Sequence, residues 1–233
     1  MTSPSFHVVI PCAGSGSRSG SLAVPKQYRS VLGRPMVLHT LDAFVGVSAI
    51  DRMVLVVSPD DAYDLDLPAQ VERVACGGIT RAQSVLAGLH HLLETGASDH
   101  DWVLVHDAAR CLITPELIDR LIQECHDDDV GGLLAIPLAD TLKEGYSSHR
   151  VRSTLPREAK WLAQTPQMFR LQELILALQQ SGSIVTDESS AIEAMGHAPK
   201  LVMGSAENLK VTYPSDWTVA EALLSVRSSN IEP

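Results

Sequence analysis

The chain contains no hydrophobic run long enough to cross a membrane, and it has few cysteines. No apolar stretch approaches the roughly 18 residues that a transmembrane helix needs. The first residues lack the basic region and the apolar core of a signal peptide, so we expect a cytoplasmic protein that does not contact a membrane. The four cysteines, Cys12, Cys76, Cys111 and Cys125, form no C-x-x-C pair and no zinc-binding spacing. This pattern favours reduced thiols.

Basic residues are outnumbered by acidic ones. The 233 residues include 18 Lys and Arg against 28 Asp and Glu, which gives a formal net charge of −10. Proteins that bind nucleic acids broadly carry a basic footprint, so this composition argues against a nucleic-acid partner. If the ligand is nevertheless an anion, several of the few basic side chains must be gathered at one site.

The apolar pattern predicts one domain of the α/β class. Apolar runs typical of strands lie at residues 8–10, 53–57, 102–105, 131–137, 201–203 and 209–212. Most of these runs lack the alternation of a half-solvated sheet, which indicates burial on both faces. Helical periodicity is found at residues 80–93, 114–125, 172–179 and 215–226. Because strands and helices alternate, we predict a three-layer fold with a mainly parallel sheet.

A loop rich in glycine and serine follows the first predicted strand, with the sequence PCAGSGSRSG from Pro11 to Gly20. A dinucleotide-binding fingerprint, G-x-G-x-x-G, fails here because the third glycine comes one residue late. A Walker A motif fails as well, because no glycine of the loop is followed by lysine. This segment alone is compatible with another kind of phosphate loop and with an ordinary strand-to-helix turn.

Charged side chains recur at strand ends and in adjoining loops, where open α/β sheets bind their ligands. The basic ones are Arg18, Lys26, Arg81, Arg110 and Lys210. Each taken alone is more often a solvated surface charge, and Asp107 could simply cap a helix. Their coincidence in an acidic chain nevertheless indicates a gathered anion site.

Residues 139–162 interrupt the alternation of strands and helices. This segment is polar, and the turn-like sequence EGYSS separates two short β-prone pieces. We predict a hairpin arm that projects from the domain. Exposed strand edges favour pairing with another chain, most simply a second copy, so we expect a homodimer formed through this arm.

Eight short motifs carry a resemblance to a known family. They are P-x-A-G-x-G-x-R, P-K-Q-Y, G-G-x-x-R-x-x-S-V, H-D-A-A-R, D-T-x-K, Q-T-P-Q-x-F, T-D-E-x-S and N-x-K-V-T. In this order they resemble the 2-C-methyl-D-erythritol 4-phosphate cytidylyltransferase family over essentially the whole chain. Four positions depart from the family pattern, namely Cys12, Ser19, Thr80 and Cys111. None of these departures removes a charged group that the site needs.

The resemblance implies a Rossmann-like nucleotidyltransferase fold, with one domain over residues 1–233 and residues 139–162 as an inserted dimerisation arm. It implies transfer of CMP from CTP to 2-C-methyl-D-erythritol 4-phosphate, which yields 4-diphosphocytidyl-2-C-methyl-D-erythritol and pyrophosphate. Mg²⁺ is the implied cofactor, held mainly by the triphosphate.

The resemblance also assigns roles to individual residues. The implied catalytic residues are Arg18, Lys26 and Lys210. The implied CTP-binding residues are Pro11, Cys12, Ala13, Gly14, Ser15, Gly16, Gly78, Ser84, Asp107 and Ala108. The implied acceptor-binding residues are Asp107, Arg110, Thr141, Arg157, Thr165 and Thr186, of which Thr141 and Arg157 would complete the pocket of the neighbouring subunit. Asp107 is also a candidate contact for the metal, whose direct ligands stay open.

Two other functions stay open at this point. Ribitol 5-phosphate cytidylyltransferase acts on another small phosphorylated polyol with the same fold and a similar loop. A non-catalytic nucleotide-binding regulator belongs to a different class, and it would be expected to lose Arg18, Lys26 or Lys210. All three residues are present.

Overall fold

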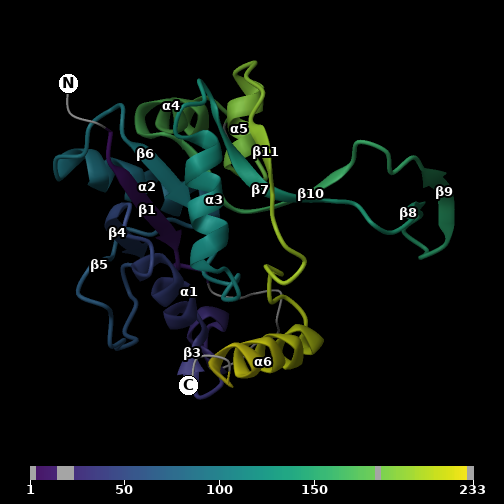
Figure 1. The fold of residues 1–233 in the computed structure, drawn as a ribbon, viewed down its shortest axis with the longest axis horizontal. Helices are drawn as coiled ribbons and strands as arrows, with labels where there is room; N and C mark the ends of the chain where they lie inside the picture. The colour runs from purple at the N-terminus through teal and green to yellow at the C-terminus, as the bar shows by residue number, and fades with distance from the viewer. Residues whose placement is uncertain (1–3, 15–23, 182–184, 230–233) are drawn as a thin grey trace.

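The computed structural model describes residues 4–14, 24–181 and 185–229, and a seven-stranded sheet runs through its centre (Figure 1). The strands of this sheet are β1 (Phe6–Pro11), β4 (Ile50–Val56), β5 (Val71–Val74), β6 (Trp102–Val105), β7 (Gly131–Pro137), β10 (Trp161–Arg170) and β11 (Lys200–Met203). Their spatial order is β11-β7-β10-β6-β1-β4-β5. Strand β1 pairs in parallel with β4 and β6, β4 with β5, and β7 with β11, whereas β10 is antiparallel to both neighbours. The predicted mainly parallel sheet is therefore confirmed.

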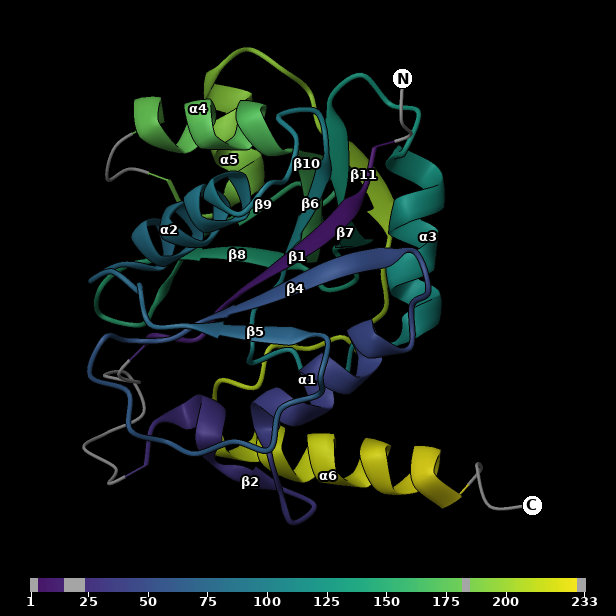
Figure 2. The ribbon, with the colours of Figure 1, turned by 90° about the vertical axis from the view of Figure 1, so that its left-hand side faces the viewer.

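Helices cover both faces of the sheet, as Figure 2 shows. They are α1 (Met36–Val45), α2 (Arg81–Glu94), α3 (Pro115–Cys125), α4 (Leu171–Ser181), α5 (Glu188–Ala194) and α6 (Pro214–Ser229), together with the short 3-10 helix η2 (Lys26–Tyr28). Alternate residues of the central strands face opposite layers, since Val8 and Ile10 pack with α1 and α3 whereas Val9 packs with α2 and α4. Because both faces are buried, the strands read as continuous apolar runs. The predicted three-layer fold is confirmed.

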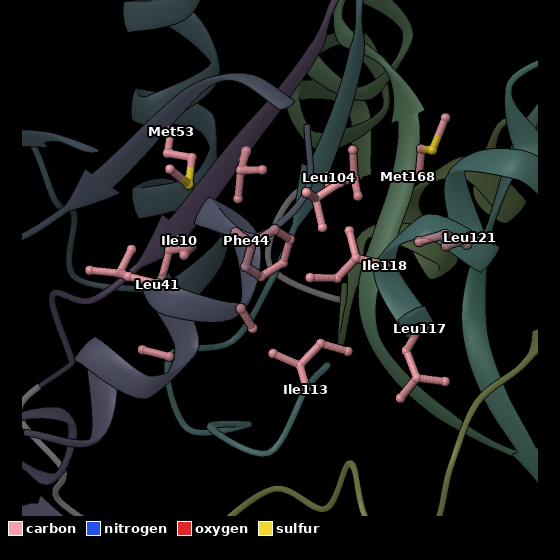
Figure 3. Packing of buried hydrophobic residues seen from close by; sticks show 14 of the residues in the cluster. Ile10, Leu41, Phe44, Met53, Leu104, Ile113, Leu117, Ile118, Leu121 and Met168 are labelled. Carbon is pink, nitrogen blue, oxygen red and sulfur yellow. The ribbon is translucent and has the colours of Figure 1, made fainter. Parts of the chain in front are cut away.

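The larger core lies between the sheet and helices α1 and α3 (Figure 3). Phe44 of α1 and Ile118 of α3 are fully buried there against Leu104 of β6. Each fully buried aliphatic or aromatic side chain contributes about 1.5–3 kcal/mol, so this layer fixes how the ends of β1 and β6 sit relative to each other. No helix among the described residues has the length and hydrophobicity needed to cross a membrane.

The predicted strand at residues 209–212 is wrong. This segment is irregular between β11 and α6, and the Val211 N–H donates to the carbonyl of Ala109 at 2.9 Å instead of joining the sheet. Val211 is fully buried in a separate cluster with α6, so its apolar character reports burial and not strand pairing. The apolar pattern of the sequence also failed to predict helix α1 and the strands β5 and β10. Strand β5 is a charged edge strand with the sequence VERV, and β10 carries buried polar residues that the site uses.

The arm is a two-stranded hairpin separate from the main sheet. It consists of β8 (Leu142–Gly145) and β9 (Val151–Leu155), which pair in antiparallel fashion, and Figure 1 shows it projecting well away from the body. A second small hairpin joins β2 (Ser30–Val31) to β3 (Arg34–Pro35). Within the predicted arm boundary, Trp161 already pairs with Pro137 of the main sheet, so the arm proper ends before residue 161.

The close approach of β7 to β10 generates the first prediction. Gly131 begins β7 at φ +103°, and a Cβ atom there would lie 2.2 Å from the carbonyl oxygen of Met168. Gly96 has a similar φ of +102° with open space around it. We expect Gly96→Ala to lower the free energy of unfolding by about 1–3 kcal/mol through backbone strain alone. Gly131→Ala should lose about a further 1–3 kcal/mol through overlap with β10, as measured by urea denaturation. Equal losses in the two variants would contradict this account.

Candidate functional site

A cavity of about 650 Å³ opens beyond the carboxyl ends of β1, β4 and β6. It is lined by Pro11, Cys12, Ala13, Gly14, Lys26, Gln27, Ser58, Pro59, Gly77, Gly78, Ile79, Thr80, Arg81, Ser84, Asp107, Ala108, Ala109 and Lys210. The structure thus brings together ten of the residues that the sequence analysis assigned to the site. Ser15, Gly16 and Arg18 lie outside the described residues.

The start of the glycine-rich loop is held by Gln27. The side-chain amide of Gln27 donates to the carbonyls of Cys12 at 2.8 Å and of Gly14 at 3.0 Å. The Cys12 N–H donates to the Val56 carbonyl at 2.7 Å, which continues the pairing of β1 with β4. These three hydrogen bonds fix the backbone at the cavity wall. The P-K-Q-Y motif supplies both Lys26 and Gln27, which lie in the same 3-10 helix.

Two glycines allow the backbone to approach the cavity closely. A Cβ atom on Gly77 would lie 2.3 Å from the Cβ of Ala13, and one on Gly78 would lie 2.4 Å from the Cβ of Gln83. Ser84 is buried beneath them, accepts a hydrogen bond from the Gly78 N–H at 3.1 Å and donates to the Thr80 carbonyl at 3.1 Å. Only residues without side chains fit here, and the backbone lines the cavity beside a fixed hydroxyl.

Asp107 lies at the centre of the charged part of the site. One carboxylate oxygen accepts from Nε of Arg81 at 2.7 Å, and the other accepts from Nζ of Lys210 at 2.6 Å. Burial raises the pKa of Asp107, but the charges and hydrogen bonds of Arg81 and Lys210 outweigh it and hold that pKa well below its usual range. Asp107 is therefore ionised throughout the neutral pH range.

Lys26 also lines this cavity. Burial lowers the pKa of Lys26, and the positive charge of Lys210 lowers it further, while Asp107 opposes both effects. The two lysines therefore repel each other, and the carboxylates of Asp107 and Asp216 oppose that effect on Lys26. An anion bound between them would relieve that repulsion, so the arrangement suits a polyanion.

The other predicted acceptor residues do not line this cavity. Arg110 donates to the carbonyls of Asn208 at 2.7 Å and Ala163 at 3.2 Å, which ties β10 to the loop that carries Lys210. The hydroxyl of Thr165 accepts from the Asp107 N–H at 3.1 Å, so Thr165 supports Asp107 from behind.

Three predicted threonine and arginine positions lie farther out. Thr186 precedes α5, where its N–H donates to the Ser190 hydroxyl. Thr141 is exposed at the start of the arm, and Arg157 at its end donates to the carbonyl of Ala139. The predicted roles of these residues in acceptor binding stay predictions.

Arg81 and Gln27 line the cavity and Glu188 pairs with Arg81, but the sequence analysis counted only Arg81 among the gathered basic residues and gave none of the three an individual role. Each of the three stands in one of the motifs that carry the family resemblance. Only the folded chain brings Arg81 and Glu188, 107 positions apart, within 2.6 Å.

No group of three or more His, Cys, Asp or Glu that could hold a metal occurs among the described residues. Asp107 has both oxygens engaged by cations.

The mainly parallel sheet, the start of the glycine-rich loop held by Gln27 and the cavity lined by Lys26 and Lys210 define a protein of the nucleotidyltransferase class of α/β folds. Residues 6–226 match the family model for 2-C-methyl-D-erythritol 4-phosphate cytidylyltransferase (IspD), and the chain belongs to that family.

Relatives of known name agree with this membership. The 2-C-methyl-D-erythritol 4-phosphate cytidylyltransferase of Burkholderia cenocepacia is 52% identical over 231 residues, which are 95% of this chain and 97% of that protein. The bifunctional enzyme IspD/IspF of Albidiferax ferrireducens is 61% identical over 98% of this chain, but the chain spans only 55% of its length.

Solved structures are similar over nearly the whole fold. A crystal structure of 4-diphosphocytidyl-2C-methyl-D-erythritol synthase has a TM-score of 0.84 at 38% identity, covering 96% of this chain and 100% of that one. The Francisella tularensis 2-C-methyl-D-erythritol 4-phosphate cytidylyltransferase has a TM-score of 0.79 at 31% identity, covering 94% and 99%.

His106 generates a prediction about pH. It is fully buried, and burial lowers its pKa to about 3 from 6.5, so it stays neutral in the folded protein. Its two ring nitrogens contact the Thr165 hydroxyl and the Arg110 carbonyl at 3.1 and 3.2 Å, which suits a neutral ring with the proton on Nε2. The unfolded chain binds a proton below pH 6.5 and the folded one does not, so stability falls as the pH drops from 6.5 towards 3.

We expect His106→Gln to remove about 2 kcal/mol of the stability lost between pH 7 and pH 5, measured by urea denaturation at both values. The same pH loss in His106→Gln as in the parent protein would contradict the neutral buried histidine.

Proposed function

We propose that this protein transfers CMP from CTP to 2-C-methyl-D-erythritol 4-phosphate and releases pyrophosphate. The observation that carries the proposal is the convergence of Lys26 and Lys210 on one cavity, beside a glycine loop, in a chain of net charge −10. Membership of the cytidylyltransferase family and the names of the relatives point to the same reaction.

The acceptor needs no general base. A phosphate monoester has a second pKa of about 6, so its oxygen is already largely ionised at neutral pH and can attack the α-phosphorus of CTP directly. The nearest histidine, His106, is buried and does not line the cavity. The remaining task is to hold two anions in line and to stabilise the negative charge of the transition state, and Lys26 and Lys210 supply that charge.

The nucleotide would occupy the rest of the cavity. The backbone from Pro11 to Gly14, fixed by Gln27, faces the triphosphate, and Ser15, Gly16 and Arg18 would continue that loop. The exposed backbone at Gly78 and the hydroxyl of Ser84 are placed to read the edge of the cytosine ring. Asp107 and Ala108 also line the cavity, and we assign Ala108 to the nucleotide and Asp107 to both substrates.

Mg²⁺ is part of the proposal. When bound, it would neutralise negative charge on the nucleotide. Because Arg81 and Lys210 occupy both oxygens of Asp107, we assign the ion mainly to the triphosphate, with Asp107 as the residue of this chain that would contact it.

The direct test is pyrophosphate release from CTP and Mg²⁺ with 2-C-methyl-D-erythritol 4-phosphate, ribitol 5-phosphate or no acceptor. We expect strong release with methylerythritol phosphate, and Lys26→Met and Lys210→Met should each lower kcat by about 10²–10³. Lys200→Met, whose ammonium pairs with Glu124 at 2.7 Å outside the cavity, is the control for loss of a lysine elsewhere. Release with ribitol phosphate alone would overturn the acceptor, and CTP binding without release would indicate a regulator.

We further propose that the arm joins two copies into a homodimer and that Thr141 and Arg157 complete the partner's acceptor site. The exposed arm residues Tyr146, Val151 and Leu155 would be covered in such a dimer. Neither Thr141 nor Arg157 lines the cavity of its own chain, which supports a role at another subunit's site. The free thiols of the four cysteines support a cytoplasmic location.

Mixing two inactive variants tests the shared site. Lys210→Met and Arg157→Met damage different parts of one composite site, so a mixed dimer retains one intact site. Unfolding and refolding an equimolar mixture should restore about a quarter of the parent activity, because half of the dimers are mixed and each has one working site. A mixture no more active than either variant would place Arg157 in its own subunit's site or remove it from the reaction.

A further inference from the structure

A buried carboxylate, Glu188, lies behind the cavity wall with no role in the proposed reaction. Its side chain is 1% exposed, and its two oxygens accept from Nη1 and Nη2 of Arg81 at 2.6 and 3.0 Å. A paired buried ion is often no more stable than a well-packed apolar pair, so stability alone does not account for it. Two parallel hydrogen bonds do, however, fix the plane of the guanidinium.

Glu188 itself is rigidly placed by the neighbouring strand. It is the first residue of α5, and Asp187 caps that helix by accepting from the Ser190 N–H at 3.0 Å. Gln167 of β10 accepts from the Ser189 N–H at 2.7 Å and donates to Asp187 at 2.9 Å, so the buried amide holds both residues that flank Glu188.

Arg81 occupies an electrostatically unfavourable position. It is the first residue of α2, where the helix dipole disfavours a positive charge. Burial alone would lower its pKa, but Glu188 and Asp107 together raise it above its ordinary range. Its Nε–H points to Asp107 while its two terminal nitrogens point to Glu188, so one planar group joins helix α5 to the end of β6.

The chain of contacts ends at Lys210. The four side chains alternate in charge from Glu188 through Arg81 and Asp107 to Lys210. Because Arg81 neutralises part of the Asp107 charge, Asp107 holds Lys210 in place without attracting it with its full charge. A phosphate can then compete for Lys210. Without Arg81 the full charge of Asp107 would fall on Lys210 and oppose its transfer to the substrate.

We infer that Arg81 and Glu188 are positioning residues that fix the Asp107 carboxylate and thereby present Lys210 to the reacting phosphate. The inference rests on the proposed function, which makes Lys210 a catalytic residue. Neither Arg81 nor Glu188 is assigned a contact with the reacting atoms, and both act through Asp107.

Two variants interrupt the chain of contacts at different points. Glu188→Gln keeps the shape but turns one acceptor into an amide that faces the guanidinium N–H groups. Arg81→Lys keeps the charge but cannot contact both carboxylates. Arg170→Lys is the matched control, because it makes the same substitution at another part-buried arginine, which stacks on Trp102 and donates to the carbonyl of His100, outside the cavity.

We expect Glu188→Gln and Arg81→Lys to lower kcat by about 10–100-fold while the KM for CTP changes by less than about threefold. The control should keep parent kinetics. Urea denaturation of each variant gives the folded fraction, so that loss of folded protein is not read as loss of kcat. Parent kcat in both folded variants would overturn the inference.

A double-mutant cycle separates positioning from a general structural effect. If Glu188 acts through Asp107, then Glu188→Gln should change kcat by less than about twofold once Asp107→Asn is present, because the group it positions is already lost. The same fold-loss in both backgrounds would show that Glu188 does not act through Asp107 and would overturn the inference.

A crystal structure of Glu188→Gln tests the inference without turnover. We expect the Asp107 and Lys210 side chains to leave their parent positions while β6 stays in place. Unmoved side chains would overturn the inference even in an active enzyme. If the parent protein releases no pyrophosphate with any acceptor, the proposed function fails, and this structure still decides whether Glu188 positions Lys210.

Discussion

The site depends on one buried carboxylate held between two cations. Asp107 stands at the end of β6, a strand buried on both faces, and its own N–H is bonded to Thr165 of β10. An unpaired carboxylate at this depth would be unfavourable, so the fold can keep Asp107 ionised only by bringing Arg81 and Lys210 to it. Those two residues come from the start of α2 and from the loop before α6, and they meet at Asp107 in the wall of the cavity.

The antiparallel strand β10 explains how such distant segments are held together. Its neighbours β6 and β7 are fixed by apolar packing, whereas the polar residues of β10 bind the loops around the site. Thr165 supports Asp107, Gln167 supports α5, and the carbonyl of Ala163 accepts from Arg110, which also ties down Asn208 two residues before Lys210. Strand β10 thus holds the loops around the site in place by hydrogen bonds, which explains why its sequence is polar.

The sequence could predict the parts of this arrangement that have a local cause. Burial on both faces makes β1, β4 and β6 continuous apolar runs, and helix α2 has its own capping residue, Thr80. Lys26 and Lys210 could be assigned because they stand inside family motifs. The pairing of Glu188 with Arg81 could not be, because no local property of either residue indicates a partner 107 positions away. The segment at residues 209–212 misled for a related reason, since an apolar residue buried under α6 looks the same as one in a strand.

An acidic chain that binds two anions must confine its positive charge, and the contacts show how this is done. Burial and the positive charge of Lys210 lower the pKa of Lys26, and the carboxylates of Asp107 and Asp216 offset only part of that effect. Glu188 in turn neutralises Arg81 from behind, away from the cavity. The pair of Glu188 and Arg81 and the pair of Asp107 and Lys210 are each neutral, and Asp216 is a further carboxylate whose charge acts on Lys26. In the proposed reaction, the phosphates of the substrates would supply the further negative charge that offsets the repulsion between Lys26 and Lys210.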